Sequence, residues 1–328
     1  MAYKKSIYLR AKQALDDRRR ASEARYWQRH AEVVAACPEI DALERQLAAT
    51  GAEVVKLAAR GESSSAQIAR LSAENLELQR KRAELLQTAG FPKDYLENVY
   101  TCPACRDTGS CGSYYCKCYL DLIRQTAKDA IPAAAMLKNC TFETFDLSYY
   151  SDEVDPALGL SHRRVMTTVV AFLKDYCSSF TPASKGLLML GKTGLGKTHL
   201  SLAVVNRLID RNFNVYYGTA QNILDRLQKE HFSRGTTDEE LDDDLYRSDL
   251  LVIDDLGTEM VTSFTVSALY NLLNTRLGNG LPTVFNTNLQ LSELEQTYSQ
   301  RFTSRLMGSC DIIEFHGRDV RQQKRNRA

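Results

Sequence analysis

The eight residues from Gly191 to Thr198 carry the strongest chemical signal in the sequence. They match the pattern G-x-x-x-x-G-K-[ST] in full, directly after an apolar run that ends at Leu190. In this pattern glycine amides wrap phosphates, the lysine reaches the β- and γ-phosphates, and the threonine binds Mg²⁺. The segment therefore predicts a nucleotide-binding loop between a strand and a helix, formed by Gly191, Lys192, Thr193, Gly194, Leu195, Gly196, Lys197 and Thr198.

A second signal is the acidic pair at the end of the apolar run Leu250–Ile253. Parallel sheets place their ligands at the carboxyl ends of strands, so this pair should lie beside the phosphate loop. Asp254 is predicted to hold Mg²⁺, and Asp255 to orient or polarise the attacking water. Such a site would hydrolyse a nucleotide by positioning and charge stabilisation.

Three further polar residues are weaker candidates. Asn288 follows the apolar run Thr283–Asn286 and could touch the γ-phosphate, although an asparagine there often only caps a turn. Arg305 could reach a neighbouring subunit's nucleotide, although a lone arginine is commonly only solvated. Arg321 could reach the phosphates of its own chain, or it could simply belong to a basic tail, 318–327, that is expected to fray.

Five of the nine cysteines fall between Cys102 and Cys118. A C-x-x-C pair and a C-x-C pair could supply four thiolates to a tetrahedral Zn²⁺, and the segment is too short to fold on a core of its own. An iron–sulfur cluster uses the same ligand set, and a redox pair or free thiols are further alternatives. The predicted zinc ligands are Cys102, Cys105, Cys116 and Cys118, with Cys111 as a substitute for one of them.

The first 95 residues are rich in helix-forming types and carry a heptad pattern from Ile40 to Leu85. Gly61 and the serines after it indicate a turn inside this pattern. Two helices packed as an antiparallel hairpin are favoured, although one interrupted helix or a plain bundle would also fit. A module of this kind more often makes protein contacts than performs catalysis.

Apolar runs alternate with helical stretches between about residues 140 and 322, which indicates a parallel sheet covered on both faces and hence an α/β fold. The chain has 42 Lys and Arg residues against 41 Asp and Glu residues. Its net charge is therefore too small for it to bind nucleic acid as a polycation. No apolar run approaches the roughly 20 residues of a membrane span, and no secretory leader opens the sequence. We therefore expect a cytoplasmic protein with no membrane contact.

The order of these motifs is similar to that of AAA+ ATPases. More narrowly, residues 140–321 resemble the bacterial replicative helicase loaders of the DnaC/DnaI-like group. The resemblance is carried by segment 139–146, the Gly191–Thr198 loop and four further segments, which are Asp254-Asp255-Leu256-Gly257, Thr287-Asn288-Leu289, Ser304-Arg305-Leu306 and Gly317-Arg318-Asp319-Val320-Arg321. ATP-binding proteins of the IstB type, which assist transposition, share most of this pattern.

The resemblance implies an ATPase with ATP, Mg²⁺ and Zn²⁺ as cofactors. Lys197 and Thr198 would take the Walker A roles, and Asp254 and Asp255 the Walker B roles, with aspartate where glutamate is usual. Asn288 would be sensor 1, Arg305 an arginine finger acting between subunits, and Arg321 sensor 2, while segment 139–146 would lie near the adenine. Self-association through the AAA+ domain and contact with single-stranded DNA are implied too. The candidate DNA contacts are the helix after Tyr216-Tyr217 and the stretch 229–234, which could equally be a surface loop.

These signals predict a helical adaptor at 1–95, a zinc knot at 96–125, an AAA+ domain at 126–322 and a basic tail at 323–328. The expected function is ATP-dependent loading of the hexameric replicative helicase onto single-stranded DNA, with the adaptor and knot gripping the helicase. One alternative is a helper ATPase that acts on a transposase. The other is a nucleotide-bound scaffold with little turnover, which the shorter Asp255 side chain would favour.

Overall fold

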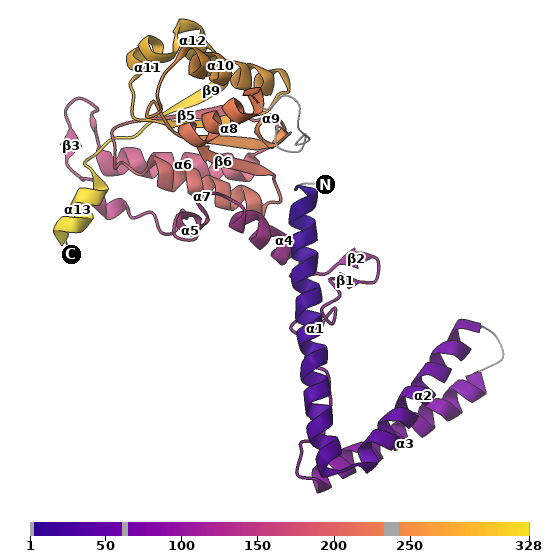
Figure 1. The fold of residues 1–328 in the computed structure, drawn as a ribbon. Coiled ribbons are helices and arrows are strands. Elements are labelled where there is room, and N and C mark those ends of the chain that lie inside the picture. Colours follow the sequence, from indigo (N-terminus) through magenta and orange to yellow (C-terminus); the bar gives the residue numbers. More distant parts are fainter. Residues whose placement is uncertain (1–2, 61–64, 233–242, 328) are drawn as a thin grey trace. The chain divides into compact units, whose positions relative to one another are not determined.

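The computed structural model describes residues 3–60, 65–232 and 243–327 (Figure 1). Its backbone contacts divide the chain into two compact units, described separately below. One unit comprises Leu9–Leu122, and the other combines Met1–Tyr8 with Ile123–Ala328. Two helices run through these boundaries, α1 (Lys5–Ala36) and α4 (Lys117–Asp129). Within the described ranges no helix is both long and apolar enough to cross a membrane.

The larger unit is an α/β domain. Its strands are β3 (Val154–Asp155), β4 (Leu160–Ser161), β5 (Gly186–Leu190), β6 (Val215–Thr219), β7 (Leu250–Leu256), β8 (Thr283–Thr287) and β9 (Cys310–Glu314). Its helices are α5 (Ala134–Leu137), the 3₁₀ helix η1 (Leu147–Tyr149), α6 (His162–Ser179), α7 (Lys197–Asp210), α8 (Ala220–Phe232), α9 (Asp243–Arg247), α10 (Ser263–Gly278), α11 (Leu291–Tyr298), α12 (Gln300–Ser309) and α13 (Val320–Arg327).

Five parallel strands form the central sheet in the order β6-β7-β8-β5-β9. The predicted parallel sheet is thus confirmed, with each expected apolar run in a strand. Because all strands point the same way, their carboxyl ends share one edge, where Leu190 pairs with Thr287 and Thr219 with Asp254. This edge brings together the polar residues that follow β5, β7 and β8.

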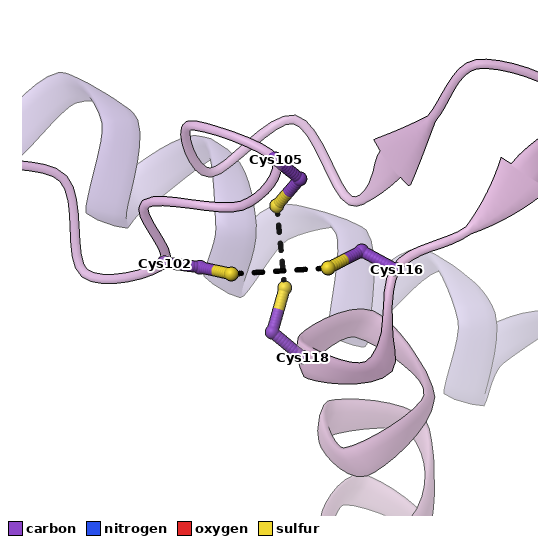
Figure 2. A group of neighbouring side chains, drawn as sticks. All are labelled: Cys102, Cys105, Cys116 and Cys118. Atoms are coloured by element: carbon purple, nitrogen blue, oxygen red, sulfur yellow. Dashed lines mark hydrogen bonds between the residues drawn. The ribbon is translucent and has the colours of Figure 1, made fainter.

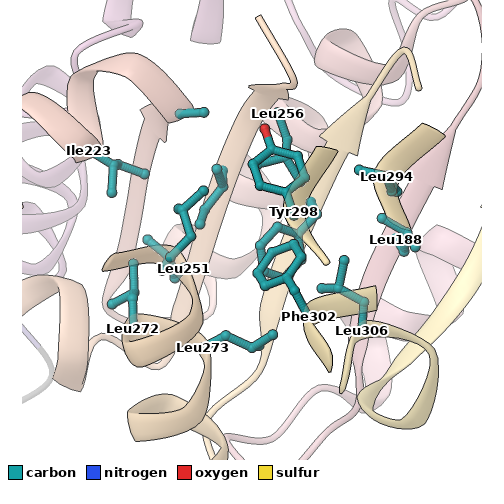
Figure 3. Close-up of a cluster of buried hydrophobic side chains, with 14 of the residues drawn as sticks. Leu188, Ile223, Leu251, Leu256, Leu272, Leu273, Leu294, Tyr298, Phe302 and Leu306 are labelled. Carbon is teal, nitrogen blue, oxygen red and sulfur yellow. The ribbon is translucent and has the colours of Figure 1, made fainter. Parts of the chain in front are cut away.

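Helices cover both faces of this sheet, with α6 and α7 on one side and α10, α11 and α12 on the other (Figure 1). Strand side chains alternate between the faces, so Leu188, Leu251 and Phe285 point into a buried cluster with residues of α8, α10, α11 and α12 (Figure 3). Removing this much apolar surface from water is the main stabilising contribution to such a layer. The rigid sheet then fixes the loops at its carboxyl edge.

The Leu9–Leu122 unit contains most of α1, then α2 (Glu39–Arg60), α3 (Ser65–Thr88) and the short strands β1 (Ser110–Cys111) and β2 (Tyr114–Tyr115). Helices α2 and α3 run antiparallel side by side (Figure 1). Arg82 pairs with Glu44 across them at 3.0 Å. Further along, Asn75 Nδ2 donates to Thr50 Oγ1 at 2.7 Å, so a polar layer lies within the heptad positions.

Three helices lie in the described part of the first 95 residues, 3–60 and 65–95, whereas the heptad pattern indicated two. The additional helix α1 ends at Ala36, because Pro38 removes a backbone donor and disfavours the helical conformation of the residue before it. Val33 of α1, Ile40 of α2 and Leu86 of α3 then meet Leu96 in a small buried core. The adaptor is therefore built around a three-way junction of helices.

Both ends of the α/β unit differ from expectation. Residues 320–327 form helix α13 where a frayed tail was expected, because the Asp319 carboxylate accepts hydrogen bonds from the N–H groups of Arg321, at 2.8 Å, and Gln322. At the other end, the Tyr3 hydroxyl donates to the Ile209 carbonyl at 2.7 Å. The residues up to Tyr8 consequently group with the α/β unit and not with the helices that follow them.

Candidate functional site

The loop between β5 and α7 has the backbone shape that phosphate binding requires. Its three glycines lie at positive φ angles of 145°, 79° and 91° for Gly191, Gly194 and Gly196. A Cβ on Gly194 would lie 2.2 Å from a carboxylate oxygen of Asp319, and one on Gly196 would lie 2.7 Å from the Phe145 ring. Only glycine fits these places, so the chain can turn its amides toward one point at the start of a helix.

Lys197 is the first residue of α7 and is 6% exposed. Its ammonium donates to the Gly191 carbonyl at 2.5 Å, to the Lys192 carbonyl at 2.9 Å and to Asn288 Oδ1 at 2.7 Å. The cation is thus held at the mouth of the loop by oxygen acceptors, which is the kind of partner that a phosphate also offers. Burial lowers the pKa of Lys197 to about 8.

This low pKa makes a prediction for nucleotide affinity. A bound triphosphate would favour the ammonium form and raise the pKa of Lys197 above its value of about 8 in the free protein. The affinity for ATP should therefore be highest below pH 8. It should fall as the pH rises above 8, by up to roughly tenfold per pH unit. Measuring the Kd of ATP between about pH 7 and 9.5 tests this. A flat profile would contradict the combination of a lowered pKa in the free protein and a phosphate contact by Lys197.

Asp254, near the end of β7, is 2% exposed and fully engaged. Its carboxylate accepts hydrogen bonds from Thr198 Oγ1 at 3.2 Å, the Tyr217 hydroxyl at 2.5 Å and Asn286 Nδ2 at 2.7 Å. Thr198 and Asp254 therefore lie together as the sequence predicted, and they offer the oxygen ligands that Mg²⁺ prefers.

Tyr217 and Asn286 were not expected in the site. They reach Asp254 from the neighbouring strands β6 and β8, and Asn286 also donates to Ser201 Oγ of α7 at 2.8 Å. Burial, followed by the charge of Asp254, raises the pKa of Tyr217, so its hydroxyl remains a donor. The signal that could have revealed Asn286 is a polar residue in the middle of the apolar run Thr283–Thr287. Both residues orient the Asp254 carboxylate.

Asp255 lies beside Asp254 but faces the open side of the site. Its backbone has a φ of 54°, which is uncommon for a non-glycine residue and coincides with an irregularity in the pairing of β7 with β8 between Ile253 and Leu256. Burial and then the charge of Asp254 raise the pKa of Asp255, while Lys197 and Arg321 oppose that rise. A partly buried carboxylate with a raised pKa is suited to polarise a water.

A cavity of about 510 Å³ lies over the loop and collects most of the predicted site. Asp255, Asn288 and Arg321 line it together with the residues from Thr193 to Thr198. Lys324 of α13 lines it too, one turn after Arg321, and was not predicted. Its ammonium lies 5.5 Å from the centre of the Tyr149 ring, which is a cation–π contact.

The segment expected near the adenine forms another wall of this cavity. Thr144, Phe145 and Asp146 line it. His199 of α7 fixes the segment, because its Nε2 lies 2.9 Å from the Thr141 carbonyl and its ring contacts Phe145 edge-on. The Tyr150 hydroxyl donates to the Leu195 carbonyl at 2.8 Å. An apolar aromatic wall beside a phosphate loop is suited to a nucleobase.

Two predicted groups lie elsewhere. Arg305 is exposed on α12, beside Tyr270 of α10, and is not among the described residues that line the cavity. The stretch 229–234 lies partly outside the described residues, so its expected DNA contacts have no structural account. Tyr216, which precedes α8, already accepts a hydrogen bond from Arg226 Nη1 at 2.9 Å and contacts its guanidinium.

Four cysteines converge between β1, β2 and the start of α4 (Figure 2). The sulfurs of Cys102, Cys105, Cys116 and Cys118 all lie within 4.8 Å of one another, with Cys102 3.8 Å from Cys116 and Cys105 3.4 Å from Cys118. Zn–S bonds of about 2.3 Å imply sulfur separations of about 3.8 Å in a tetrahedron, so this group fits zinc. Cys111 is exposed in β1 and is not part of it.

Asp107, in the segment between the two cysteine pairs, shapes this centre. It is 1% exposed, has a φ of 57° and accepts 2.8 Å hydrogen bonds from the N–H groups of Thr101 and Cys102. These bonds hold the turn that places Cys102 and Cys105 on one side of the centre. A buried carboxylate that accepts hydrogen bonds from backbone N–H groups strongly stabilises a local turn.

Comparison with known proteins gives a consistent assignment. Residues 127–328 match the family of IstB-like ATP binding proteins. The replicative helicase loader DnaI of Bacillus subtilis (strain 168) is 29% identical over 181 residues, which cover 54% of this chain and 54% of DnaI. The replicative helicase loader DnaC of Escherichia coli (strain K12) is 28% identical over 133 residues, or 40% of this chain and 54% of DnaC.

The chain thus spans about half the length of the curated relatives it matches. Among solved structures, the crystal structure of the DnaC helicase loader is 20% identical, with a TM-score of 0.46, and the match covers 55% of this chain and 98% of that one. The family match spans 127–328 and contains the phosphate loop, the acidic pair and α13. The resemblance noted in the sequence is confirmed, and the chain belongs to the family of IstB-like ATP binding proteins.

Proposed function

We propose that this protein is an ATPase that loads the replicative DNA helicase onto single-stranded DNA. The observation that carries the proposal is the assembled site at the sheet edge, where Lys197 and Thr198 line one cavity and Thr198 donates a hydrogen bond to the Asp254 carboxylate. The choice of helicase loading over other ATP-driven tasks is supported by relatives that are named replicative helicase loaders.

Each residue has a task in this proposal. Lys197 and the loop amides hold the β- and γ-phosphates, while Thr198 and Asp254 would hold Mg²⁺, which neutralises charge on the phosphates. Asp255 polarises the attacking water from the cavity side, and Asn288 lies next to Lys197 where the γ-phosphate would be. Arg321 contributes positive charge from its own chain, and Arg305 contributes it to a neighbouring chain.

The position of Arg305 leads to a prediction. Arg305→Ala should leave ATP affinity nearly unchanged and lower hydrolysis in the assembled state by about 10³-fold or more, because an arginine finger stabilises charge only in the transition state. Phosphate release from the purified variant measures this. Arg301→Ala is the matched control, since Arg301 is also exposed on α12.

Mixing variants tests whether Arg305 acts between chains. Arg305→Ala protein keeps an intact phosphate loop, and Lys197→Ala protein keeps an intact Arg305, so a mixed assembly contains some complete sites. Hydrolysis should reappear on mixing, once size measurements have shown that the two variants assemble together. Continued inactivity of a verified mixed assembly would refute action in trans.

The Leu9–Leu122 unit would contain most of the helical adaptor and of the zinc knot in this proposal. Cys102, Cys105, Cys116 and Cys118 would hold a structural Zn²⁺ that joins the segment before β1 to the start of α4. The proposed layout is the helical adaptor at 1–95, the zinc knot at 96–125 and the AAA+ domain at 126–322. The adaptor and knot would grip the helicase, while ATP-dependent self-association would hold single-stranded DNA.

Two other functions keep specific support. The IstB-like family match favours a helper ATPase that acts on a transposase. The side chain of Asp255 is one methylene shorter than the usual glutamate, which favours a nucleotide-bound scaffold with little turnover. Steady-state phosphate release with and without single-stranded DNA separates a scaffold from a working ATPase.

Identification of the partner tests the proposal. The purified chain is incubated with lysate of its own host, ATP and Mg²⁺, and the captured proteins are identified by mass spectrometry. Recovery of the replicative helicase, and its loss when Lys197→Ala protein is the bait, is the expected result. Recovery of a transposase would favour the helper function, and recovery of neither would contradict both.

A further inference from the structure

Glu259 is a buried carboxylate that the proposed reaction does not use. It lies in the loop after β7, four residues beyond Asp255, and is 6% exposed. Its Oε2 accepts a 2.9 Å hydrogen bond from the Gly257 N–H, and its Oε1 accepts one from the Tyr298 hydroxyl. A carboxylate is stable in such a place only if its hydrogen-bond partners offset the free energy lost when it is removed from water.

Its partner, Tyr298, is the last residue of α11 and is 1% exposed. The ring packs on Phe302 with centroids 5.2 Å apart, and both lie in the buried cluster under the sheet (Figure 3). Burial raises the pKa of Tyr298, so the hydroxyl stays protonated and donates a hydrogen bond to Glu259. A charge-assisted bond therefore joins the loop after the acidic pair to the end of α11.

The next residue turns the chain into the helix that carries Arg305. Ser299 has a φ of 102°, and α12 begins directly after it at Gln300. A non-glycine residue holds such a conformation only where its surroundings impose it. The Ser299 carbonyl accepts from the Thr303 N–H at 3.1 Å, so the turn is continuous with α12. The direction of α12 thus depends on a junction that Tyr298 anchors.

The other end of this connection lies at the nucleotide site. Gly257 has a φ of 100°, and a Cβ there would lie 2.5 Å from Leu289, the residue after Asn288. The Thr287 hydroxyl donates to the Leu256 carbonyl at 2.7 Å. The loop that carries Glu259 is therefore packed against the strand ends that present Asp255 and Asn288.

We propose that Glu259 and Tyr298 are positioning residues, which hold α12 so that Arg305 reaches the nucleotide of a neighbouring chain. The inference rests on the proposed role of Arg305 in trans, and it adds the contact that fixes the position of Arg305. Tyr298→Phe removes only the hydroxyl and keeps the buried ring. The variant should bind ATP as the wild type does and lose about tenfold or more of its hydrolysis in the assembled state.

A mixing experiment separates positioning of Arg305 from a merely structural effect. In a verified mixed assembly of Tyr298→Phe and Lys197→Ala proteins, the intact loop of the first faces an unperturbed Arg305 from the second, so hydrolysis should return. Glu259→Gln, which keeps an acceptor but removes the charge, should show a smaller loss and the same rescue. Tyr176→Phe is the matched control, because it deletes another buried hydroxyl, bonded to the Lys185 carbonyl at 2.8 Å, away from α12.

Three outcomes would overturn the inference. Wild-type hydrolysis by Tyr298→Phe would show that the hydroxyl has no positioning role. A loss that mixing does not rescue, while Arg305→Ala mixed with Lys197→Ala is rescued, would place the effect of Tyr298 in its own site. If neither mixture is rescued, Arg305 does not act in trans, and the failure lies in the proposed function as well.

Discussion

Lys197→Ala is expected to abolish measurable ATP binding. The ammonium is buried in the phosphate loop, where it donates hydrogen bonds to the Gly191 and Lys192 carbonyls and to Asn288 Oδ1. Truncating one partner of a buried charged pair costs about 2–5 kcal/mol, so the Kd should rise by about 30-fold at the least and by more than 10³-fold at the upper end. Titration of a fluorescent ATP analogue measures it.

The control for this experiment is Lys185→Ala. Lys185 lies just before β5, at the opposite end of the same strand, and its side chain is 69% exposed in a pair with Asp311. This variant should bind ATP like the wild type, and both variants should keep the thermal stability of the fold. A Lys197→Ala protein that binds ATP within about threefold of the wild type would refute the phosphate-loop assignment.

The second large effect concerns the cysteine centre. The purified protein should contain one zinc ion per chain, and Cys105→Ser should reduce that content to near zero, because Cys105 is a buried member of the four-sulfur group. Cys111→Ser should keep the ion, since Cys111 is exposed and outside the group. Elemental analysis by mass spectrometry gives the content directly.

Loss of the metal should also melt the knot, because the four cysteines lose the bonds that join them and the segment has little core. A chelator should therefore lower the Tm of this unit and leave ATP affinity nearly unchanged. Iron with visible absorbance would instead indicate an iron–sulfur cluster. Metal loss in Cys111→Ser equal to that in Cys105→Ser would contradict the ligand set.

The nucleotide site was largely predictable because its signals are local. The loop Gly191–Thr198 places glycines where only glycine fits, and its lysine and threonine follow at a fixed spacing. Asp254 and Asn288 follow apolar strands, and the parallel order then forces them to one edge. Tyr217 could not be assigned in the same way, since its role depends on which strand neighbours β7.

The ends of the chain were less predictable, because composition does not reveal a distant partner. Residues 318–327 are basic, which favoured a frayed tail. Asp319 instead caps helix α13. The N–H of Val320, the first residue of α13, also donates to the Gly194 carbonyl at 2.9 Å. Helix α1 shows almost no amphipathic pattern. The heptad pattern therefore indicated only the helices α2 and α3. Glu259 and Tyr298 are separated by 39 positions, and no local spacing connects them.

The central claim is that ATP bound at this site drives transfer of a helicase to single-stranded DNA. The most direct measurement combines the host's replicative helicase, this protein and closed circular single-stranded DNA, and quantifies helicase that co-elutes with the circles. The account predicts helicase on the circles only when wild-type protein and ATP are both present, and none with Lys197→Ala. Equal helicase on the circles with and without this protein would contradict it.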